Sequence, residues 1–175
     1  MKHKLLLIYA WFIRTILFFL PDIPFIMSFR GFMYGLAMKK CGKDFQVTHD
    51  ANLKVLQEIS IGNHVFIGNA TVLLAGGGIM IEDNVLIGPH CILVSGNHSF
   101  ENGSYRFGKS ILGEIIIKHG SWVGGNCTVT KSSILPPFSV LGANSLLNKQ
   151  FIESNALYAG VPAKLVKCDL NVIEK

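Results

Sequence analysis

A period of six residues runs through residues 115–147, which read IIIKHGSWVGGNCTVTKSSILPPFSVLGANSLL. An aliphatic residue recurs at every sixth position, and a serine or cysteine follows most of these four places later. This period fits neither the 3.6-residue turn of an amphipathic helix nor the two-residue alternation of a strand. It predicts a coil with flat faces and tight corners, whose aliphatic side chains fill a narrow core as coils stack. The aliphatic positions are Ile117, Val123, Val129, Leu135, Leu141 and Leu147.

The same period occurs upstream, so the repeat covers most of the chain. We expect glycine or asparagine to supply the left-handed backbone at the corners, as in Gly62-Asn63 and Gly142-Ala143-Asn144. Stacked coils of this kind pair their strands in parallel, which predicts an all-β parallel β-helix over residues 44–167. The upstream aliphatic positions are Ile61, Ile67, Leu73, Ile81, Ile87 and Leu93.

Two interruptions break the repeat. The step from Leu73 to Ile81 is eight residues long and contains three consecutive glycines, which predicts a bulge at a corner. Residues 97–113 lose the pattern, although the register resumes at Ile117. We expect residues 97–113 to form an excursion loop, and loops that leave a rigid scaffold often carry function.

Positive charge is concentrated at the N-terminus. Residues 1–43 have a net charge of +6 and contain one acid, Asp22, whereas the other 132 residues sum to −1. The body therefore has no basic patch for nucleic acid. The four cysteines are spaced neither as zinc ligands nor as a disulfide framework, so we expect reduced cysteines in a cytoplasmic protein.

An apolar run extends from Leu5 to Leu20 and stops at Pro21. It is shorter than the roughly 20 residues that cross a bilayer, and Arg14 lies within it. The residues after it do not form a signal-peptide cleavage site. We expect residues 1–43 to be a helical segment that lies in the membrane interface or packs on a partner subunit.

Three local matches indicate a family. Residues 84–98, ending in SGNH, are similar to the stretch leading to the catalytic histidine of hexapeptide-repeat acyltransferases. Residues 121–126 (SWVGGN) resemble the tryptophan-glycine coil of these enzymes, and residues 159–164 (AGVPAK) resemble their C-terminal signature. The resemblance covers residues 59–167 and implies a left-handed β-helix that forms a homotrimer with sites between subunits. Residues 168–175 would be a short C-terminal tail.

Within this superfamily, the sequence looks closest to O-acetyltransferases of capsule, exopolysaccharide or lipopolysaccharide synthesis. The acceptor-contacting asparagine of maltose and galactoside acetyltransferases falls on Gly68, with Asn69 next to it. The expected acceptor is therefore a sugar hydroxyl on a surface polysaccharide or its precursor. Together with the basic apolar N-terminus, this places the expected site of action at the cytoplasmic face of a membrane.

The resemblance implies direct transfer of acetyl from acetyl-CoA, with His98 as the general base. His98 is the only histidine in the excursion, and imidazole titrates near neutral pH. A backbone N–H of Gly124 or Gly125 is the expected oxyanion donor, because glycine lets the main chain approach a ligand. The expected acetyl-CoA contacts are Gly125, Ala143, Asn148, Lys149 and Lys164, with Lys167 near the phosphates. The expected acceptor contacts are Asn97, Trp122 and Asn69, although Trp122 is equally compatible with subunit packing.

Two alternatives share the fold. A γ-class carbonic anhydrase would bind zinc through three histidines, two of them close together, whereas His90 and His98 lie eight residues apart. We therefore expect no metal site. A non-catalytic scaffold would have no need of His98, the excursion and the C-terminal signature together.

Overall fold

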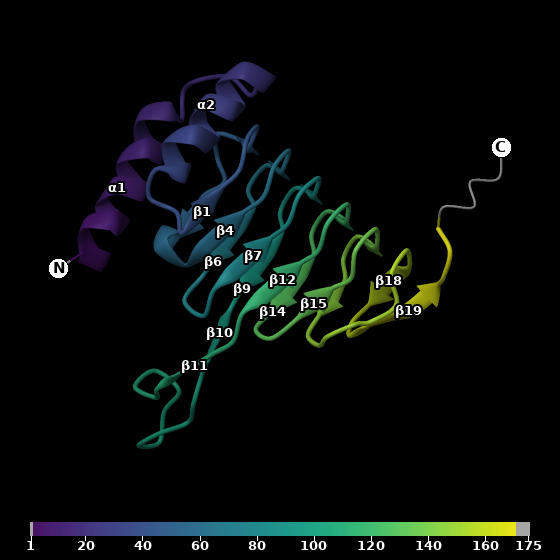
Figure 1. The fold of residues 1–175 in the computed structure, drawn as a ribbon. Coiled ribbons are helices and arrows are strands. Elements are labelled where there is room, and N and C mark those ends of the chain that lie inside the picture. Colours follow the sequence, from purple (N-terminus) through teal and green to yellow (C-terminus); the bar gives the residue numbers. More distant parts are fainter. Residues whose placement is uncertain (1, 171–175) are drawn as a thin grey trace.

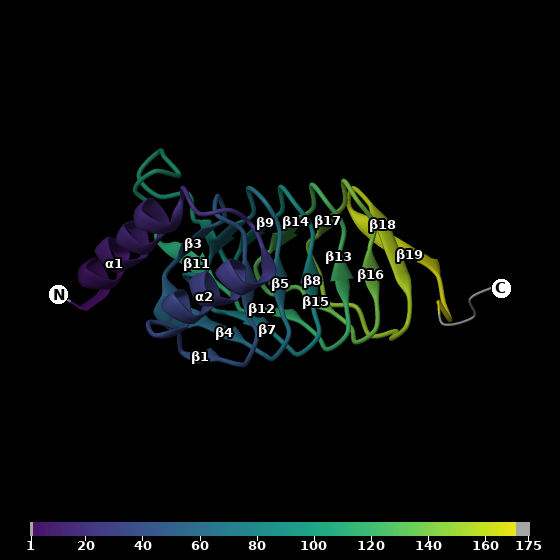
Figure 2. The ribbon, with the colours of Figure 1, turned by 90° about the horizontal axis from the view of Figure 1, so that it is seen from above.

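The computed structural model describes residues 2–170 of the chain. Two helices, α1 (Lys2–Leu17) and α2 (Pro24–Gly35), precede a column of stacked coils (Figure 1). Figure 2 shows the helices at one end of the column and the last two strands at the other. No helix in the described part of the chain is both long and apolar enough to span a membrane.

Each coil contributes strands to three parallel sheets, which form the three faces of the column. Sheet 1 consists of β1 (Lys40–Cys41), β4 (Ile59–Ile61), β7 (Ile79–Ile81), β12 (Ile115–Ile117) and β15 (Ile134–Leu135). Sheet 2 consists of β2 (Gln46–Val47), β5 (Phe66–Ile67), β8 (Leu86–Ile87), β13 (Trp122–Val123), β16 (Val140–Leu141), β18 (Leu157–Gly160) and β19 (Ala163–Lys167). Sheet 3 consists of β3 (Asn52–Lys54), β6 (Val72–Leu74), β9 (Ile92–Val94), β14 (Thr128–Thr130) and β17 (Leu146–Leu147). A short 3₁₀ turn, Leu56–Glu58, connects sheet 3 to sheet 1 in the first coil.

The strand register confirms the parallel β-helix predicted from the six-residue period. Ile61 pairs with Ile81, which pairs with Ile117, and Ile117 pairs with Leu135. All four side chains are at most 1% exposed. Aliphatic residues of successive coils therefore stack into columns, and burial of these columns is the main source of stability.

Of the two predicted corners, Gly142-Ala143-Asn144 has its left-handed residue at Asn144 (φ 58°), as expected for asparagine. The corner glycines themselves have a different role. Gly62 lacks a positive φ, and the left-handed residue of that corner is His64, with a φ of 54°. A Cβ on Gly62 would lie 2.6 Å from the backbone nitrogen of Asp83 in the next coil. Likewise, a Cβ on Gly124 would lie 2.7 Å from the backbone nitrogen of Ala143. Glycine is needed at these positions because adjacent coils come too close for any side chain.

The strands of the column begin shortly before residue 44 and end at Lys167. Cys41 pairs with Ile61, so the first coil begins at β1, before residue 44. A two-residue strand shows too little of the period to be found in the sequence. At the other end, β19 reverses direction and pairs antiparallel with β18. The predicted tail is described as far as Leu170, and residues 171–175 lie outside the described residues.

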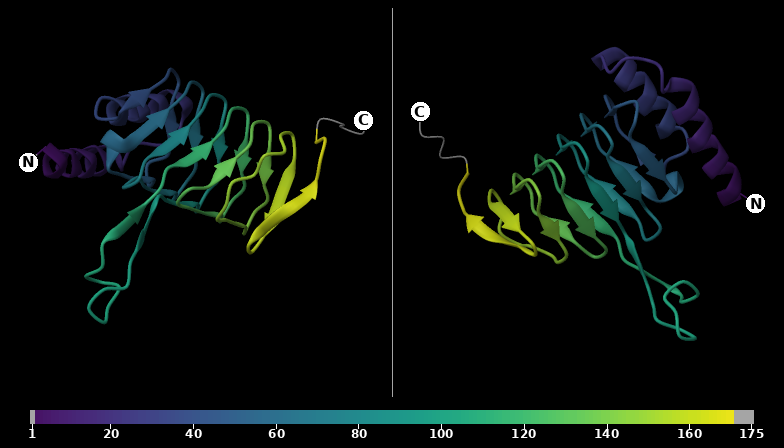
Figure 3. Two further views of the ribbon diagram at one scale, coloured as in Figure 1. Left: turned by 60° about the horizontal axis from the view of Figure 1, so that its bottom comes forward. Right: turned by 180° about the vertical axis from the view of Figure 1, so that it is seen from behind.

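Residues between β9 and β12 leave the column as a two-stranded ribbon. Its strands, β10 (Gly96–His98) and β11 (Ser110–Leu112), pair antiparallel, and the ribbon projects away from the coils (Figures 1 and 3). Beyond these strands, the rings of Phe100 and Tyr105 lie 5.0 Å apart. The ribbon leaves the column at the corner between sheets 3 and 1.

A buried arginine attaches the helices to the coils. Arg30 of α2 is fully buried, and its guanidinium donates hydrogen bonds to Asp22 (3.0 Å) and to the backbone oxygen of Val47 in β2. It also donates to the backbone carbonyls of Leu17 (3.3 Å) and Leu20 (3.1 Å), which lie at the end of α1 and in the connection to α2. One side chain thus joins the end of α1, the connection between the helices and the first coil.

Substitutions of two adjacent isoleucines test the inward and outward register. Ile117→Ala should lower the free energy of unfolding by about 2–5 kcal/mol, because it leaves a cavity in the aliphatic column. Ile116 faces outward and is only partly buried, so Ile116→Ala should cost less than about half as much. Chemical denaturation followed by circular dichroism, at one protein concentration, compares the two. Equal losses would show that the register is wrong.

Candidate active site

His98 lies in the ribbon with a free imidazole. It is the last residue of β10, its backbone is paired with that of Ser110, and its side chain is exposed. Within residues 2–170, no hydrogen bond or ion pair reaches the imidazole. Asn97 is also exposed and is paired with Ile111. Both ring nitrogens of His98 are therefore available to a ligand or to a neighbouring chain.

The base of the ribbon is fixed by Ser95 and the preceding coil. The buried Ser95 hydroxyl donates to the Leu74 carbonyl (3.1 Å) and accepts a hydrogen bond from the Gly77 amide (2.8 Å). A Cβ on Gly77 would lie 2.4 Å from the backbone oxygen of Ser95 and 2.5 Å from the backbone nitrogen of Gly113. Gly77 therefore makes room for the ribbon, a link that the sequence pattern did not indicate.

Of the two predicted oxyanion donors, the structure leaves only Gly125 free. The Gly124 amide donates to the Leu141 carbonyl at 2.8 Å, as part of the stacking between coils. Of the two predicted alternatives, Gly124 is therefore the less suitable donor, because its hydrogen is already in use. The Gly125 amide donates to no group within the described residues. A Cβ on Gly125 would meet only Pro89 atoms at 3.5 Å, so the Gly125 backbone lies open at the corner between sheets 2 and 3.

The predicted site residues divide between two corners of the column. Gly125, Ala143 and Asn69 lie at the corner between sheets 2 and 3. His98, Asn148 and Lys149 lie at the corner between sheets 3 and 1 or on the ribbon that leaves it. The strands of sheet 3 separate the two corners by about 10 Å, at about 3.3 Å per residue. One chain therefore does not bring His98 and Gly125 together.

The remaining predicted residues lie on or near the faces of the column. Trp122 points outward from sheet 2, is 49% exposed, and stacks in register between Leu86 and Val140. Lys164 is exposed on β19, opposite Ala159. The amine of Lys149 lies 5.0 Å from the centre of the Phe151 ring.

A polar cluster at the corner between sheets 2 and 3 was missed in the sequence, except for Asn69. The Asp22 carboxylate accepts hydrogen bonds from the His49 backbone (2.8 Å) and contacts the His49 imidazole (2.7 Å). The Asn69 amide donates to Asp22 and to Asp50, at 3.3 Å each. Burial raises the pKa of Asp22, but hydrogen bonds from His49 and the charges of His49 and Arg30 outweigh it, so the pKa is lowered. The one available signal was that Asp22 is the only acid in residues 1–43.

Comparisons with known proteins show which enzymes the chain resembles. No protein-family model matches the chain. A hexapeptide-repeat-containing acetyltransferase from Vibrio cholerae superposes with a TM-score of 0.84 at 25% identity, covering 97% of this chain and 93% of that one. In fold and in sequence, the chain resembles the hexapeptide-repeat acetyltransferases. Because so much of the chain is covered, the N-terminal helices are part of the shared fold.

Two curated acyltransferases are also similar to the chain in sequence. An Escherichia coli protein described as a lipopolysaccharide biosynthesis O-acetyl transferase is 28% identical over 118 residues, 62% of this chain. UDP-3-O-acylglucosamine N-acyltransferase 1 of Sulfurimonas denitrificans is 23% identical over 137 residues, 74% of this chain. The matches span 57% and 39% of the two relatives, respectively. The Vibrio cholerae acetyltransferase has also been solved in complex with acetyl coenzyme A.

The histidine, cysteine and acidic side chains of the described residues do not form a metal centre. Within residues 2–170, no three histidine, cysteine, aspartate or glutamate side chains are grouped so that they could hold a metal ion. His64 and His90 are corner residues with φ of 54° and 57°, and each lies at a different corner of the column.

Asp22→Asn tests the polar cluster through its pH dependence. A carboxylate whose pKa is lowered by folding stabilises the protein above its ordinary pKa of 3.8, and this contribution is lost as pH falls through the folded value. Asp22→Asn should therefore destabilise the protein most at about pH 5 and progressively less below pH 3.8. Urea denaturation across this range measures the difference.

Asp169→Asn is the matched control, because it removes one exposed carboxylate at the other end of the chain. It should change stability little. A loss in Asp22→Asn that stays constant down to pH 2–3 would contradict the assigned pairing.

Proposed function

We propose that the chain transfers an acetyl group from acetyl-CoA to a sugar hydroxyl of a bacterial surface polysaccharide or its precursor. The observation that carries the proposal is the free His98 imidazole on a ribbon built into an acetyltransferase fold. The name of one relative supports it: the Escherichia coli protein is described as an O-acetyl transferase of lipopolysaccharide biosynthesis. The crystallised complex of the Vibrio cholerae protein supports acetyl-CoA as the donor.

His98 acts as the general base in a direct transfer. The acceptor oxygen bonds to the thioester carbonyl carbon while its proton passes to the His98 imidazole. Collapse of the tetrahedral intermediate breaks the carbon–sulfur bond, and the proton returns to the sulfur of coenzyme A. The exposed side chain has no internal partner that would compete for this proton.

The Gly125 amide stabilises the oxyanion of the intermediate. A single aimed donor of this kind contributes about 3 kcal/mol to the transition state. The open backbone at Gly125 and Ala143 accepts the pantetheine arm, and Asn148 contacts it from the neighbouring subunit. The cations of Lys149 and Lys164 meet the phosphates, with Lys167 next along β19. Asn97, Trp122 and Asn69 contact the acceptor.

The site is completed by a neighbouring subunit in a homotrimer. His98 and Gly125 lie at different corners of one chain, so a site that uses both must combine two chains. The ribbon also carries exposed apolar side chains far from any core, including Phe107 (72% exposed) and Tyr105 (64%). Contact with an adjacent column would bury them. The left-handed sense of the coil stays a prediction from the family resemblance, as does action at the cytoplasmic face of the membrane.

His98→Ala tests the catalytic role. It should lower kcat by about 10²–10⁴-fold with little change in thermal stability, because it removes a base but no packing. Release of the coenzyme A thiol is measured with acetyl-CoA and a panel of free, nucleotide-linked and lipid-linked sugars. His64→Ala, which removes another exposed imidazole, should keep wild-type activity.

Equal rates for His98→Ala and wild type on a true acceptor would contradict the assignment of the base. A wild-type protein that neither binds acetyl-CoA nor releases thiol with any acceptor would favour the non-catalytic scaffold.

A further inference from the structure

The two N-terminal helices carry a large exposed apolar surface. Among residues 2–170, 14 of the 27 large apolar side chains that are exposed lie between Leu5 and Leu36. The buried side of α1, which includes Ala10, Ile13 and Leu17, already packs on the core. Soluble surfaces rarely concentrate apolar side chains in this way, so the outward side needs a partner.

On each helix, the outward apolar residues follow the helical period. On both helices, successive exposed apolar residues are three or four positions apart, so each helix presents one apolar stripe. The α1 stripe consists of Leu5, Ile8, Phe12, Ile16 and Phe19. The α2 stripe consists of Phe25, Phe29, Phe32 and Leu36, the last lying just beyond the helix. We call these two stripes, with the connection between the helices, the helical face.

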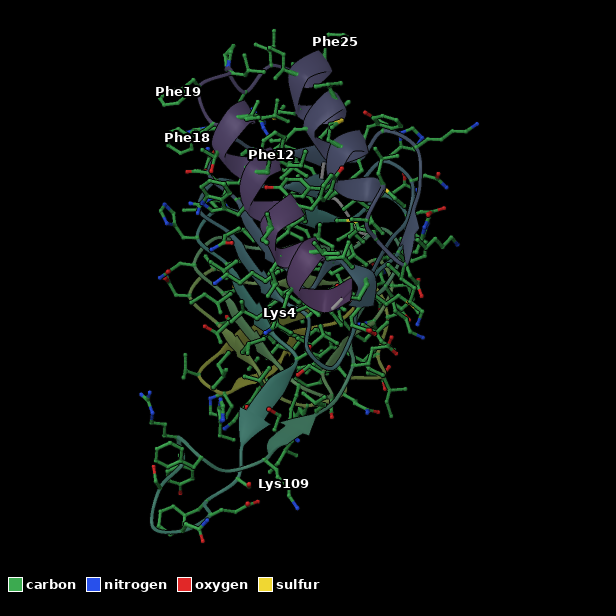
Figure 4. The ribbon with its side chains drawn as sticks, turned by 90° about the vertical axis from the view of Figure 1, so that its left-hand side faces the viewer. Lys4, Phe12, Phe18, Phe19, Phe25 and Lys109 are labelled. Atoms are coloured by element: carbon green, nitrogen blue, oxygen red, sulfur yellow. The ribbon has the colours of Figure 1, made fainter. Side chains whose placement is uncertain are left out.

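The most exposed rings lie around the connection between the helices. Phe19 is 87% exposed and Phe25 is 81% exposed. Figure 4 shows Phe18, Phe19 and Phe25 at the end of the helices where α1 passes into α2, while Lys4 lies toward the other end of α1. Next to these rings, Trp11, Arg14 and Phe18 help line a groove of about 240 Å³. Aromatic rings beside a cation are typical of segments that insert to the depth of lipid headgroups.

The charge of this region favours an anionic partner. Lys4, Lys39, Lys40 and Lys43 are exposed around the helices. Asp22 is the only acid in residues 1–43, and it is engaged by Arg30 and His49. The next acid, Asp44, is partly exposed beside α2 and accepts hydrogen bonds from Ser28 and Gln46 (2.8 and 2.9 Å). The helical face therefore presents mainly cations and apolar groups. A second copy of the chain would bring the same positive charges together, which disfavours self-association through this face.

We infer that the helical face docks on an anionic phospholipid bilayer, with α1 lying along the surface. At 1.5 Å per residue, its 16 residues form a rod of about 24 Å that lies in the headgroup layer with the aromatic connection inserted deepest. The lysines then meet the lipid phosphates. This docking does not depend on acetyl transfer, and it would hold the ribbon and its His98 near a membrane-bound acceptor.

Sedimentation of the full-length chain with vesicles tests the docking. Vesicles of phosphatidylcholine and phosphatidylglycerol in equal parts should retain the protein, and pure phosphatidylcholine should retain much less. High salt should weaken retention, because it screens the lysines. The double variant Phe19→Ser/Phe25→Ser should bind at least about tenfold more weakly, since each ring loses its burial in lipid.

The matched control is Phe138→Ser/Ile152→Ser, which removes two exposed apolar side chains from the coils. It should bind anionic vesicles as the wild type does, and circular dichroism checks that both variants fold. Failure of wild type to bind anionic vesicles would overturn the inference. Unchanged binding by the Phe19→Ser/Phe25→Ser variant, or equal binding of wild type to neutral and anionic vesicles, would also overturn it. A smaller oligomer in the Phe19→Ser/Phe25→Ser variant would overturn it as well, because the face would then be a subunit interface. The assay contains no acetyl-CoA, so its outcome is separate from that of the catalytic proposal.

Discussion

Close stacking of the coils is the constraint on which the rest of the structure depends. Successive turns approach so closely at Gly62 and Gly124 that a Cβ would collide with the next backbone. In return, each inward aliphatic side chain sits directly on its equivalent in the neighbouring coil, as Ile81 does between Ile61 and Ile117. This geometry leaves three flat faces and three rigid corners, and every functional feature is attached to one of them.

The rigid column determines where chemistry can occur. The ribbon leaves at one corner because Gly77 makes room for Ser95 and Gly113, and it carries His98 away from the chain's own coils. The open Gly125 amide lies at another corner, across the width of sheet 3. A catalytic site that uses both residues therefore has to form between chains. In the same way, the Arg30 contacts hold the helices at the end of the column, where their apolar face stays outward.

The sequence predicts the parts of this molecule that repeat, and it misses those that depend on contacts between distant segments. The aliphatic period was enough to predict the coil and its register, and the loss of the period showed where His98 leaves it. The period could not show that the Gly124 hydrogen is used in stacking while that of Gly125 is free, because both residues look alike in the repeat. The cluster of Asp22, His49 and Asn69 joins three separate segments, and no local pattern connects them. The antiparallel strand β19 could not be predicted either, because its residues do not follow the six-residue period.

Mixing two inactive variants tests the central claim, that the site combines His98 of one chain with Gly125 of another. His98→Ala lacks the base, and Gly125→Leu fills the open backbone corner, where a side chain fits without clashing with the coil. If the two variants are co-expressed in equal amounts, about a quarter of the shared sites in a trimer contain neither substitution. The account predicts that the mixture recovers about that fraction of wild-type thiol release. Recovery of no activity, with mixed trimers shown to form, would contradict it.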